Sequence, residues 1–192
     1  MRKIVSKQEE GKKQKRNQLI IGIILIIVMF GSTFGIIVNS FGKENSNTKV
    51  KYNGLEFTKQ NERWFVNIGD FQFSFKYNPY EVEEIGKDSG LKYLNNYYNK
   101  PLYLSSQNTE ASSEIYTNIE GIAQRVQGAC LEEENCEGNL PVKNCTSNFI
   151  IIKESDSNEI KQEENCVFIS GTEENLTKIS DEFLFQIIGV RQ

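Results

Sequence analysis

The chain has 192 residues, a formal net charge of −4 and no histidine. Without histidine it cannot activate a serine or cysteine nucleophile through imidazole, and nearly every type of catalytic zinc site is excluded as well. The charge is divided unevenly, because residues 1–42 hold seven Lys and Arg against two Glu, whereas the remaining 150 residues hold 15 basic and 24 acidic groups. That acidic excess argues against nucleic acid as a partner, since a phosphate backbone is bound by positive charge.

The first predicted element is a single transmembrane helix from Leu19 to Val38, a stretch of 20 residues without a charge. At about 1.5 Å per residue, a helix of this length covers roughly 30 Å, the thickness of the hydrocarbon core of a bilayer. Basic residues next to a span stay on the cytoplasmic side. The sequence therefore predicts a cytoplasmic tail over residues 1–18, a single pass through the plasma membrane, a polar tether over residues 39–50 and an extracellular domain over residues 51–192.

A cleaved signal peptide is the alternative interpretation of this apolar stretch, with Ser40 and Gly42 as the small residues at the cleavage site. The apolar region of a signal peptide has about 7–15 residues, so the longer run favours a retained signal-anchor. Within the run, Gly31 and Gly35 form a GxxxG match that would let two helices pack closely as a homodimer. Glycine is frequent in membrane helices for other reasons, so the homodimer stays a hypothesis.

The first part of the domain is predicted to be an antiparallel meander of three strands. Apolar and polar side chains alternate over residues 54–59, 64–68 and 71–77, which is the period of strands with one buried face. Gly69-Asp70, between the last two stretches, is a two-residue hairpin signal. This turn places six apolar residues opposite one another on the buried face: Ile68 with Phe71, Val66 with Phe73, and Trp64 with Phe75.

The middle of the domain predicts a short strand and a long amphipathic helix. Residues 101–105 have the composition of a strand. Thr109 would cap the helix, because apolar residues recur at helical spacing as far as Cys130, and the polar face with Glu114 would meet solvent. The connection over residues 86–100 is the best candidate contact for an unknown protein or surface partner. It carries three tyrosines: Tyr93, Tyr97 and Tyr98.

The last part of the domain predicts three strands and a second amphipathic helix. Residues 149–153 are a continuous apolar run, as expected for a central strand, and a turn at residues 155–158 would fold a polar strand, residues 159–163, back into a hairpin with it. A strand at residues 167–170 precedes a helix that Asn175 can cap. The fold class is therefore α+β, with an antiparallel meander, a further mixed sheet and two amphipathic helices.

The four cysteines, Cys130, Cys136, Cys145 and Cys166, all lie on the predicted extracellular side. An even number in an oxidising compartment indicates two disulfides. The alternatives are a four-thiolate zinc site and a thiol–disulfide redox centre, and the absence of a CxxC pair counts against both. If the turn at residues 155–158 is tight, it brings positions 145 and 166 together, so we expect Cys145 to pair with Cys166 and Cys130 with Cys136.

Other short motifs add little chemistry. Two sequons, at Asn144 and Asn175, fit an exported glycoprotein, although such triplets also occur by chance. No phosphate-binding glycine loop is found in the sequence, and no cofactor or metal ion is implied by its motifs.

Several segments carry a resemblance to a known group of proteins: YNGLEFTKQNERWFVNIGDFQFSFKYNP, NLPVKNC, FIIIKES, ENCVFISG and LTKISDEFLFQIIGV. Together with the basic tail and the anchor, they resemble uncharacterised single-pass membrane-anchored ectodomain proteins of small-genome archaea, over most of the domain. These segments are patterns of fold and contain no catalytic motif. The resemblance implies an anchor, export and disulfides, and it implies no activity and no site residue.

Two functions from different classes are compatible with these features. The first is a membrane-anchored extracytoplasmic binding or scaffolding domain of the cell envelope, because the chain has an anchor and disulfides and lacks catalytic motifs. The alternative is a histidine-free carboxylate enzyme, such as a glycoside hydrolase acting outside the membrane, which would need one acidic side chain in an apolar setting that raises its pKa. Asp181 and Glu182 stand in a polar run and are expected at the solvated surface. Glu56 is expected to point outward, and Asp70 to lie in an exposed turn.

Overall fold

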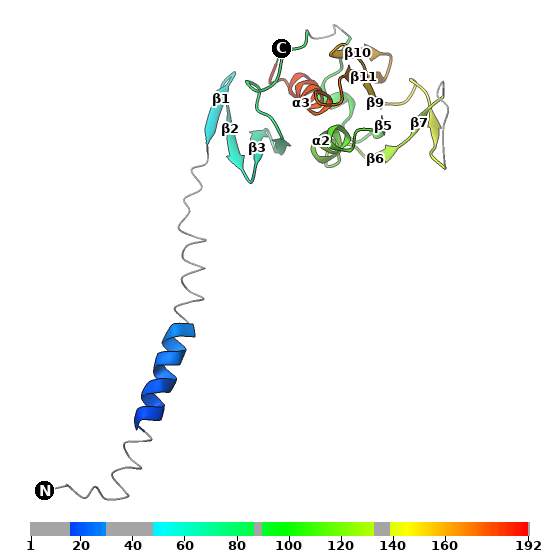
Figure 1. The fold of residues 1–192 in the computed structure, drawn as a ribbon. Coiled ribbons are helices and arrows are strands. Elements are labelled where there is room, and N and C mark those ends of the chain that lie inside the picture. Colours follow the sequence, from blue (N-terminus) through cyan, green and yellow to red (C-terminus); the bar gives the residue numbers. More distant parts are fainter. Residues whose placement is uncertain (1–15, 30–47, 87–89, 133–138, 192) are drawn as a thin grey trace, which may run out of the picture. The chain divides into compact units, whose positions relative to one another are not determined.

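The computed structural model describes residues 16–29, 48–86, 90–132 and 139–191 (Figure 1). The chain divides into two units, Met1–Ser46 and Asn47–Gln192. In the first unit, residues 16–29 form a helix whose side chains are almost all exposed. Within the described ranges, no helix combines the length and the apolar character that a membrane crossing requires.

The predicted span extends beyond that helix. Residues 30–38, which would complete it, lie outside the described residues, and so do Gly31 and Gly35 of the predicted homodimer contact. The transmembrane helix and the homodimer therefore stay predictions.

The second unit begins with a four-stranded antiparallel sheet in the order β1-β2-β3-β4. Its strands are β1 (Lys49–Tyr52), β2 (Leu55–Gln60), β3 (Arg63–Ile68) and β4 (Phe71–Phe75). The meander has one strand more than predicted, because β1 begins inside the stretch assigned to the tether. Asn53 and Gly54 form the turn between β1 and β2, and both have positive φ angles, of 47° and 80°. Asparagine and glycine adopt this conformation most readily, which explains the tight hairpin.

The predicted register between β3 and β4 is confirmed at all three apolar pairs, Ile68 with Phe71, Val66 with Phe73 and Trp64 with Phe75. The inner pairs are buried, whereas Phe71 at the turn is 37% exposed. The alternation in the sequence therefore identified the buried face of this sheet, and the turn residues fixed its register.

A mixed sheet of five strands follows, in the order β10-β11-β9-β5-β6. Its strands are β5 (Pro101–Ser106), β6 (Arg125–Gly128), β9 (Phe149–Glu154), β10 (Glu159–Glu163) and β11 (Cys166–Gly171). The strand β9 is central, as predicted, with parallel neighbours on both sides. The predicted β9–β10 hairpin is wrong, because β11 inserts between them and forms the antiparallel hairpin with β10. The polar β10 therefore takes the edge of the sheet, where one side of a strand meets solvent.

The long helix predicted from Thr109 to Cys130 is only half right. The helix α2 spans Thr109–Ile119, and Asn108 caps it by accepting a hydrogen bond from the backbone of Ala111. The following residues form β6, which pairs in parallel with β5. Helical spacing of apolar residues did not separate the two, because Val126 also packs against the core when β6 pairs with β5.

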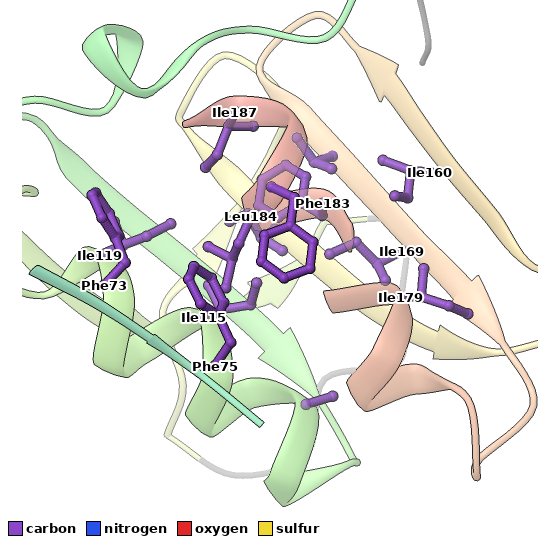
Figure 2. Packing of buried hydrophobic residues seen from close by; sticks show 14 of the residues in the cluster. Phe73, Phe75, Ile115, Ile119, Ile160, Ile169, Ile179, Phe183, Leu184 and Ile187 are labelled. Atoms are coloured by element: carbon purple, nitrogen blue, oxygen red, sulfur yellow. The ribbon is translucent and has the colours of Figure 1, made fainter. Parts of the chain in front are cut away.

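The helices α2 and α3 (Leu176–Ile187) form a layer between the two sheets (Figure 1). The predicted apolar face of α3 packs on the mixed sheet, with Phe183 and Leu184 in the centre (Figure 2). The opposite face of α3 is also buried, since Phe185 meets the rings of Phe75 and Phe57 from the first sheet, with centroids 4.6 and 6.0 Å apart. Both faces of this helix layer are therefore closed to water.

The other face of the mixed sheet holds a smaller apolar cluster. It consists of Tyr103, Ala129, Leu131, Phe149, Ile151 and Cys166, with Cys145 and Phe168 packed against it. Two short strands, β7 (Cys130–Leu131) and β8 (Val142–Lys143), form a parallel pair beside it. A single 3-10 turn, Leu94–Asn96, lies in the connection before β5.

Candidate functional site

The disulfide between Cys145 and Cys166 is formed, with an S–S distance of 2.09 Å and Cα atoms 4.9 Å apart. The predicted pair is confirmed, but the geometry differs from the expected hairpin. The strands β9 and β11 run parallel, with Cys166 opposite Phe149. The segment that enters β9 therefore meets the start of β11 at the same end of the two strands. The second predicted pair includes Cys136, which lies outside the described residues.

A cavity of about 330 Å³ opens next to this disulfide. It is lined by Lys100, Pro101, Tyr103, Thr146, Ser147, Asn148 and Asn165. Asn165 precedes Cys166, and its side-chain amide donates to the carbonyl oxygens of Cys145 and Thr146, both at 3.1 Å. The disulfide and these hydrogen bonds therefore fix the cavity wall formed by the segment that enters β9.

Tyr103 lies in this cavity between two cationic side chains. Nη2 of Arg125 donates to the phenol oxygen at 3.0 Å. Nζ of Lys143 lies 4.8 Å from the centre of the ring, within the range of cation–π attraction. The hydrogen bond from Arg125 lowers the pKa of Tyr103, and Lys143 acts in the same direction. Both cations stabilise negative charge at the phenol oxygen.

The surroundings of Tyr103 are positive although the domain is acidic. Within the described part of the chain, no carboxylate forms an ion pair with Arg125, Lys143 or Lys100. A fourth cation, Lys92, donates through Nζ to the side-chain oxygen of Asn165 in the cavity wall. Four basic residues therefore gather at the edge of the mixed sheet where β5 begins.

A second cavity, of about 440 Å³, borders the other side of Cys145 and Thr146 and has the opposite charge. Glu132, Glu163 and Glu164 line it. Among the described residues, no group of three or more histidine, cysteine or acidic side chains is arranged to hold a metal ion.

A third cavity, of about 430 Å³, lies at the carboxyl ends of β5 and β9, an edge at which α/β sheets often bind ligands. Two of its polar side chains, those of Ser106 and Asn108, make local hydrogen bonds. Ser106 bonds to the backbone of Asn108 in both directions, and Asn108 caps α2. The side chains of Ser106 and Asn108 are therefore already hydrogen-bonded within the loop that leads into α2.

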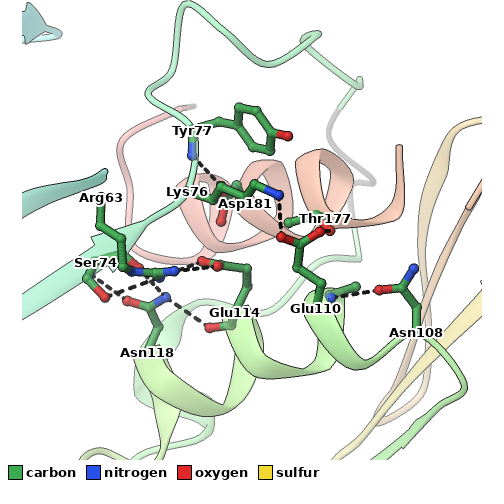
Figure 3. Close-up of polar contacts among 11 residues, drawn as sticks. Arg63, Ser74, Lys76, Tyr77, Asn108, Glu110, Glu114, Asn118, Thr177 and Asp181 are labelled. Atoms are coloured by element: carbon green, nitrogen blue, oxygen red, sulfur yellow. Dashed lines mark hydrogen bonds and ion pairs between the residues drawn. The ribbon is translucent and has the colours of Figure 1, made fainter. Parts of the chain in front are cut away.

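Two carboxyl groups converge in the helix layer, at Glu114 of α2 and Asp181 of α3 (Figure 3). Arg63 binds Glu114 with two nitrogens, at 2.7 and 2.8 Å, and the backbone N–H of Tyr77 donates to Oδ2 of Asp181 at 2.9 Å. Burial raises the pKa of Asp181 well above its usual range, and the charge of Glu114 raises it further. Because the guanidinium of Arg63 stabilises the Glu114 carboxylate, we assign the proton of the pair to Asp181.

The expectation that Asp181 and Glu182 lie at the solvated surface is wrong, because both are fully buried. Glu182 forms an ion pair of 2.7 Å with Arg191 and accepts a hydrogen bond from Gln186 at 2.9 Å. Burial raises the pKa of Glu182, against the opposing effects of Gln186 and Arg191. The segment after β4, through Tyr77 and Ile85, and Arg191 near the C-terminus contact this side of α3 and turn an apparently polar face into an interior one.

Asp181 and Glu182 have a raised pKa, as an acid catalyst requires, but the buried carboxyl groups lack access to solvent. Glu114 is 2% exposed and Asp181 is not exposed, and neither lines any of the three cavities above. The acidic residues beside the aromatic face, Glu56 and Asp70, are exposed as expected. The carboxyl pair therefore has a structural role, and no substrate could reach it without the sheet and helix layers separating.

The remaining predicted surface sites differ in accessibility. Asn144 of the first sequon is exposed, and its side-chain oxygen accepts from the hydroxyl of Thr146 at 2.6 Å. In the second sequon Asn175 is half-buried and Thr177 is buried. Glycosylation at both sites stays a prediction. In the tyrosine-rich connection, Tyr93 and Tyr98 are exposed, as a partner contact requires, whereas Tyr97 is buried in the core.

Sequence reasoning did not single out Tyr103, Arg125 or Lys143 as site residues, since they come from three separate strands and no motif joins them. The comparisons with other proteins add no assignment. No family model, curated protein or solved structure matches this chain.

Proposed function

We propose that this chain is a membrane-anchored extracytoplasmic domain that binds a ligand or partner in the cell envelope. The observation that carries the proposal is the disulfide from Cys145 to Cys166, which braces the wall of the cavity beside Tyr103. Disulfides persist in oxidising compartments outside the cytoplasm, so the domain belongs there. The uncharged run from Leu19 to Val38 and the basic tail before it support an anchor with a cytoplasmic N-terminus.

The structure of the domain favours binding over catalysis. The cavity beside Tyr103 has a braced wall and is lined mainly by polar side chains, which suits a polar ligand. The carboxyl groups of Glu114 and Asp181, which converge as an acid-catalysed hydrolysis would require, are buried between the two sheets. We therefore do not propose the carboxylate enzyme.

Protease accessibility in intact cells tests the location. Protease added outside should digest the domain and leave a protected fragment that contains residues 1–18. A domain that resists digestion in intact cells but is digested after lysis would refute the proposed orientation. Sequencing of the N-terminus of the mature protein distinguishes the anchor from a cleaved signal, which would give a start near Lys43.

The state of the cysteines in cells provides a second measurement. Thiol-reactive reagent added to the denatured, unreduced protein should leave Cys145 and Cys166 unmodified, and reduction should expose both. Free thiols at these positions in freshly lysed cells would remove the evidence for an oxidising compartment.

A further inference from the structure

We propose that the cavity beside Tyr103 and the exposed rings of Tyr93 and Tyr98 form one binding site for a glycan, a short chain of sugar units. This inference rests on the proposed binding function and names the chemical class of the ligand. A sugar unit has a face of C–H groups and a rim of hydroxyl groups. The negative face of an aromatic ring attracts the first, and neutral donors and acceptors bind the second.

The first argument is that the tyrosine-rich connection builds part of the cavity wall. Lys100, at the end of the connection, lines the cavity. The side-chain amide of Asn148, also in the lining, donates to the carbonyl oxygen of Asn96 at 3.3 Å. Lys92 donates through Nζ to the side-chain oxygen of Asn165, a further lining residue. The connection is therefore attached to the cavity along its length, and a ligand in the cavity lies beside it.

The second argument is the exposure of two aromatic rings on an anchored segment. Tyr93 is 57% exposed and Tyr98 is 58% exposed, before and after the 3-10 turn Leu94–Asn96. Leu91 and Tyr97 of the same segment are buried in the core and hold it in place. A tyrosine ring supplies a large contact area at a low cost in side-chain entropy. These rings are therefore preorganised for a ligand with an apolar face.

The third argument is the chemistry of the lining. It includes the hydroxyls of Thr146 and Ser147, the amide of Asn148 and the ammonium group of Lys100. An amide has two N–H donors and an acceptor oxygen, so the bond from Asn148 to Asn96 uses only part of its capacity. The volume of about 330 Å³ lies at the lower end of the range for small-molecule sites. The cavity thus suits a single hydroxyl-rich unit.

The separation of polar and aromatic groups favours a glycan over a protein partner. A protein contact depends on a few large side chains that fill desolvated apolar pockets. Here the cavity is mainly polar, and the exposed rings of Tyr93 and Tyr98 lie on the neighbouring segment outside its lining. A glycan fits this arrangement, because one unit can occupy the cavity while the C–H face of the next packs on a tyrosine ring.

The experiment is a calorimetric titration of the full chain with four trisaccharides: cellotriose, mannotriose, galactotriose and triacetylchitotriose. The protein is purified in a detergent without a sugar head group, since such a head group would compete for the site. We expect saturable binding of at least one trisaccharide with a stoichiometry of one per chain. The comparison of the four shows which hydroxyl arrangement the cavity prefers.

Variants at exposed positions locate the binding. Tyr98→Ala should weaken binding by about tenfold, whereas Tyr98→Phe keeps the ring and should stay within about twofold of wild type. Lys100→Gln should weaken binding by about threefold, because it removes a hydrogen-bond donor from the lining. Tyr80→Ala is the matched control and should change the affinity less than about twofold. Tyr80 is 68% exposed, and its hydroxyl donates to the carbonyl oxygen of Lys51 in the first sheet.

Three outcomes would overturn the inference. The first is the absence of saturable binding for all four trisaccharides in the folded wild type. The second is wild-type affinity in both Tyr98→Ala and Lys100→Gln. The third is an equal loss in Tyr98→Ala and Tyr80→Ala, which would indicate non-specific contact with tyrosines. A titration in detergent does not depend on membrane orientation, so its failure would leave the location proposal to the protease test, and the reverse also holds.

Discussion

Replacing Asp181 with asparagine is the sharpest test of the buried carboxyl pair. In the folded protein, burial and the charge of Glu114 raise the pKa of Asp181 well above its usual range. In the unfolded chain the carboxyl has a pKa of about 3.9. The folded state therefore binds the proton more tightly, and the stabilisation is complete below about pH 4 and is lost as the pH rises through the folded pKa.

The magnitude follows from the linkage between proton binding and folding. While the unfolded Asp181 is ionised and the folded one is protonated, the free energy of unfolding falls by about 1.4 kcal/mol per pH unit, the value for one proton. Asparagine cannot ionise, yet its side-chain oxygen can still accept from the backbone N–H of Tyr77. Asp181→Asn should thus be close to wild type near pH 4 and should become the more stable of the two as the pH rises.

The assay is urea unfolding of both proteins at steps of half a pH unit from about pH 4 to 9, followed by circular dichroism. Titrating groups distant from the pair act equally in the two proteins, so the difference in free energy reports the titration of Asp181 together with its neighbour Glu114. Asp156→Asn, in the exposed turn before β10, is the matched control and should show a constant difference. A wild type and an Asp181→Asn variant with parallel profiles would refute the assignment of the proton to Asp181.

Two further predictions test the packing and the cross-link. Phe73→Ala should cost about 3–5 kcal/mol of stability in urea unfolding, because Phe73 is 1% exposed in the core. Gln72→Ala, on the exposed face of the same strand, should cost less than about 1 kcal/mol, and equal costs would contradict the register. Cys145→Ser and Cys166→Ser should each lose about 3 kcal/mol, since the bond closes a loop with a sequence separation of 21. The double variant should be no worse than either single one, and an additive loss would show that the thiols contribute separately.

The sequence predicted the elements whose signals are local. The meander follows from period-two alternation and the Gly69-Asp70 turn, and the register at Val66 and Phe73 follows from both. The strand β1 could have been predicted too, since Asn53-Gly54 is a strong hairpin signal that the polar composition of the preceding stretch obscured.

The parts that the sequence did not predict depend on which elements become neighbours. Arg63 and Glu114 form their ion pair across a separation of 51 residues, and Tyr77 reaches Asp181 across 104. The helical spacing of the sequence predicts Glu114 on the solvent face of its helix. That assignment assumed one covered face per helix, whereas the first sheet closes the second face as well. The cluster at Tyr103 could not be predicted either. Arg125 comes close to Tyr103 only because β6 pairs in parallel with β5.

The first sheet is covered by residues near the end of the described chain, which the ribosome makes last. Its strands are therefore synthesised well before the residues that cover them. Asn53, at the turn after β1, donates to the carbonyl oxygen of Val190, and the two residues are 137 positions apart. At about 5–20 residues per second, the ribosome needs roughly 7–30 s to make the intervening chain. Throughout that interval the aromatic face with Phe57 and Phe75 lacks Phe185, which covers it in the finished fold. The aromatic face of the meander is therefore exposed apolar surface for most of the time that the domain is being made, and it becomes covered only after α3 has emerged.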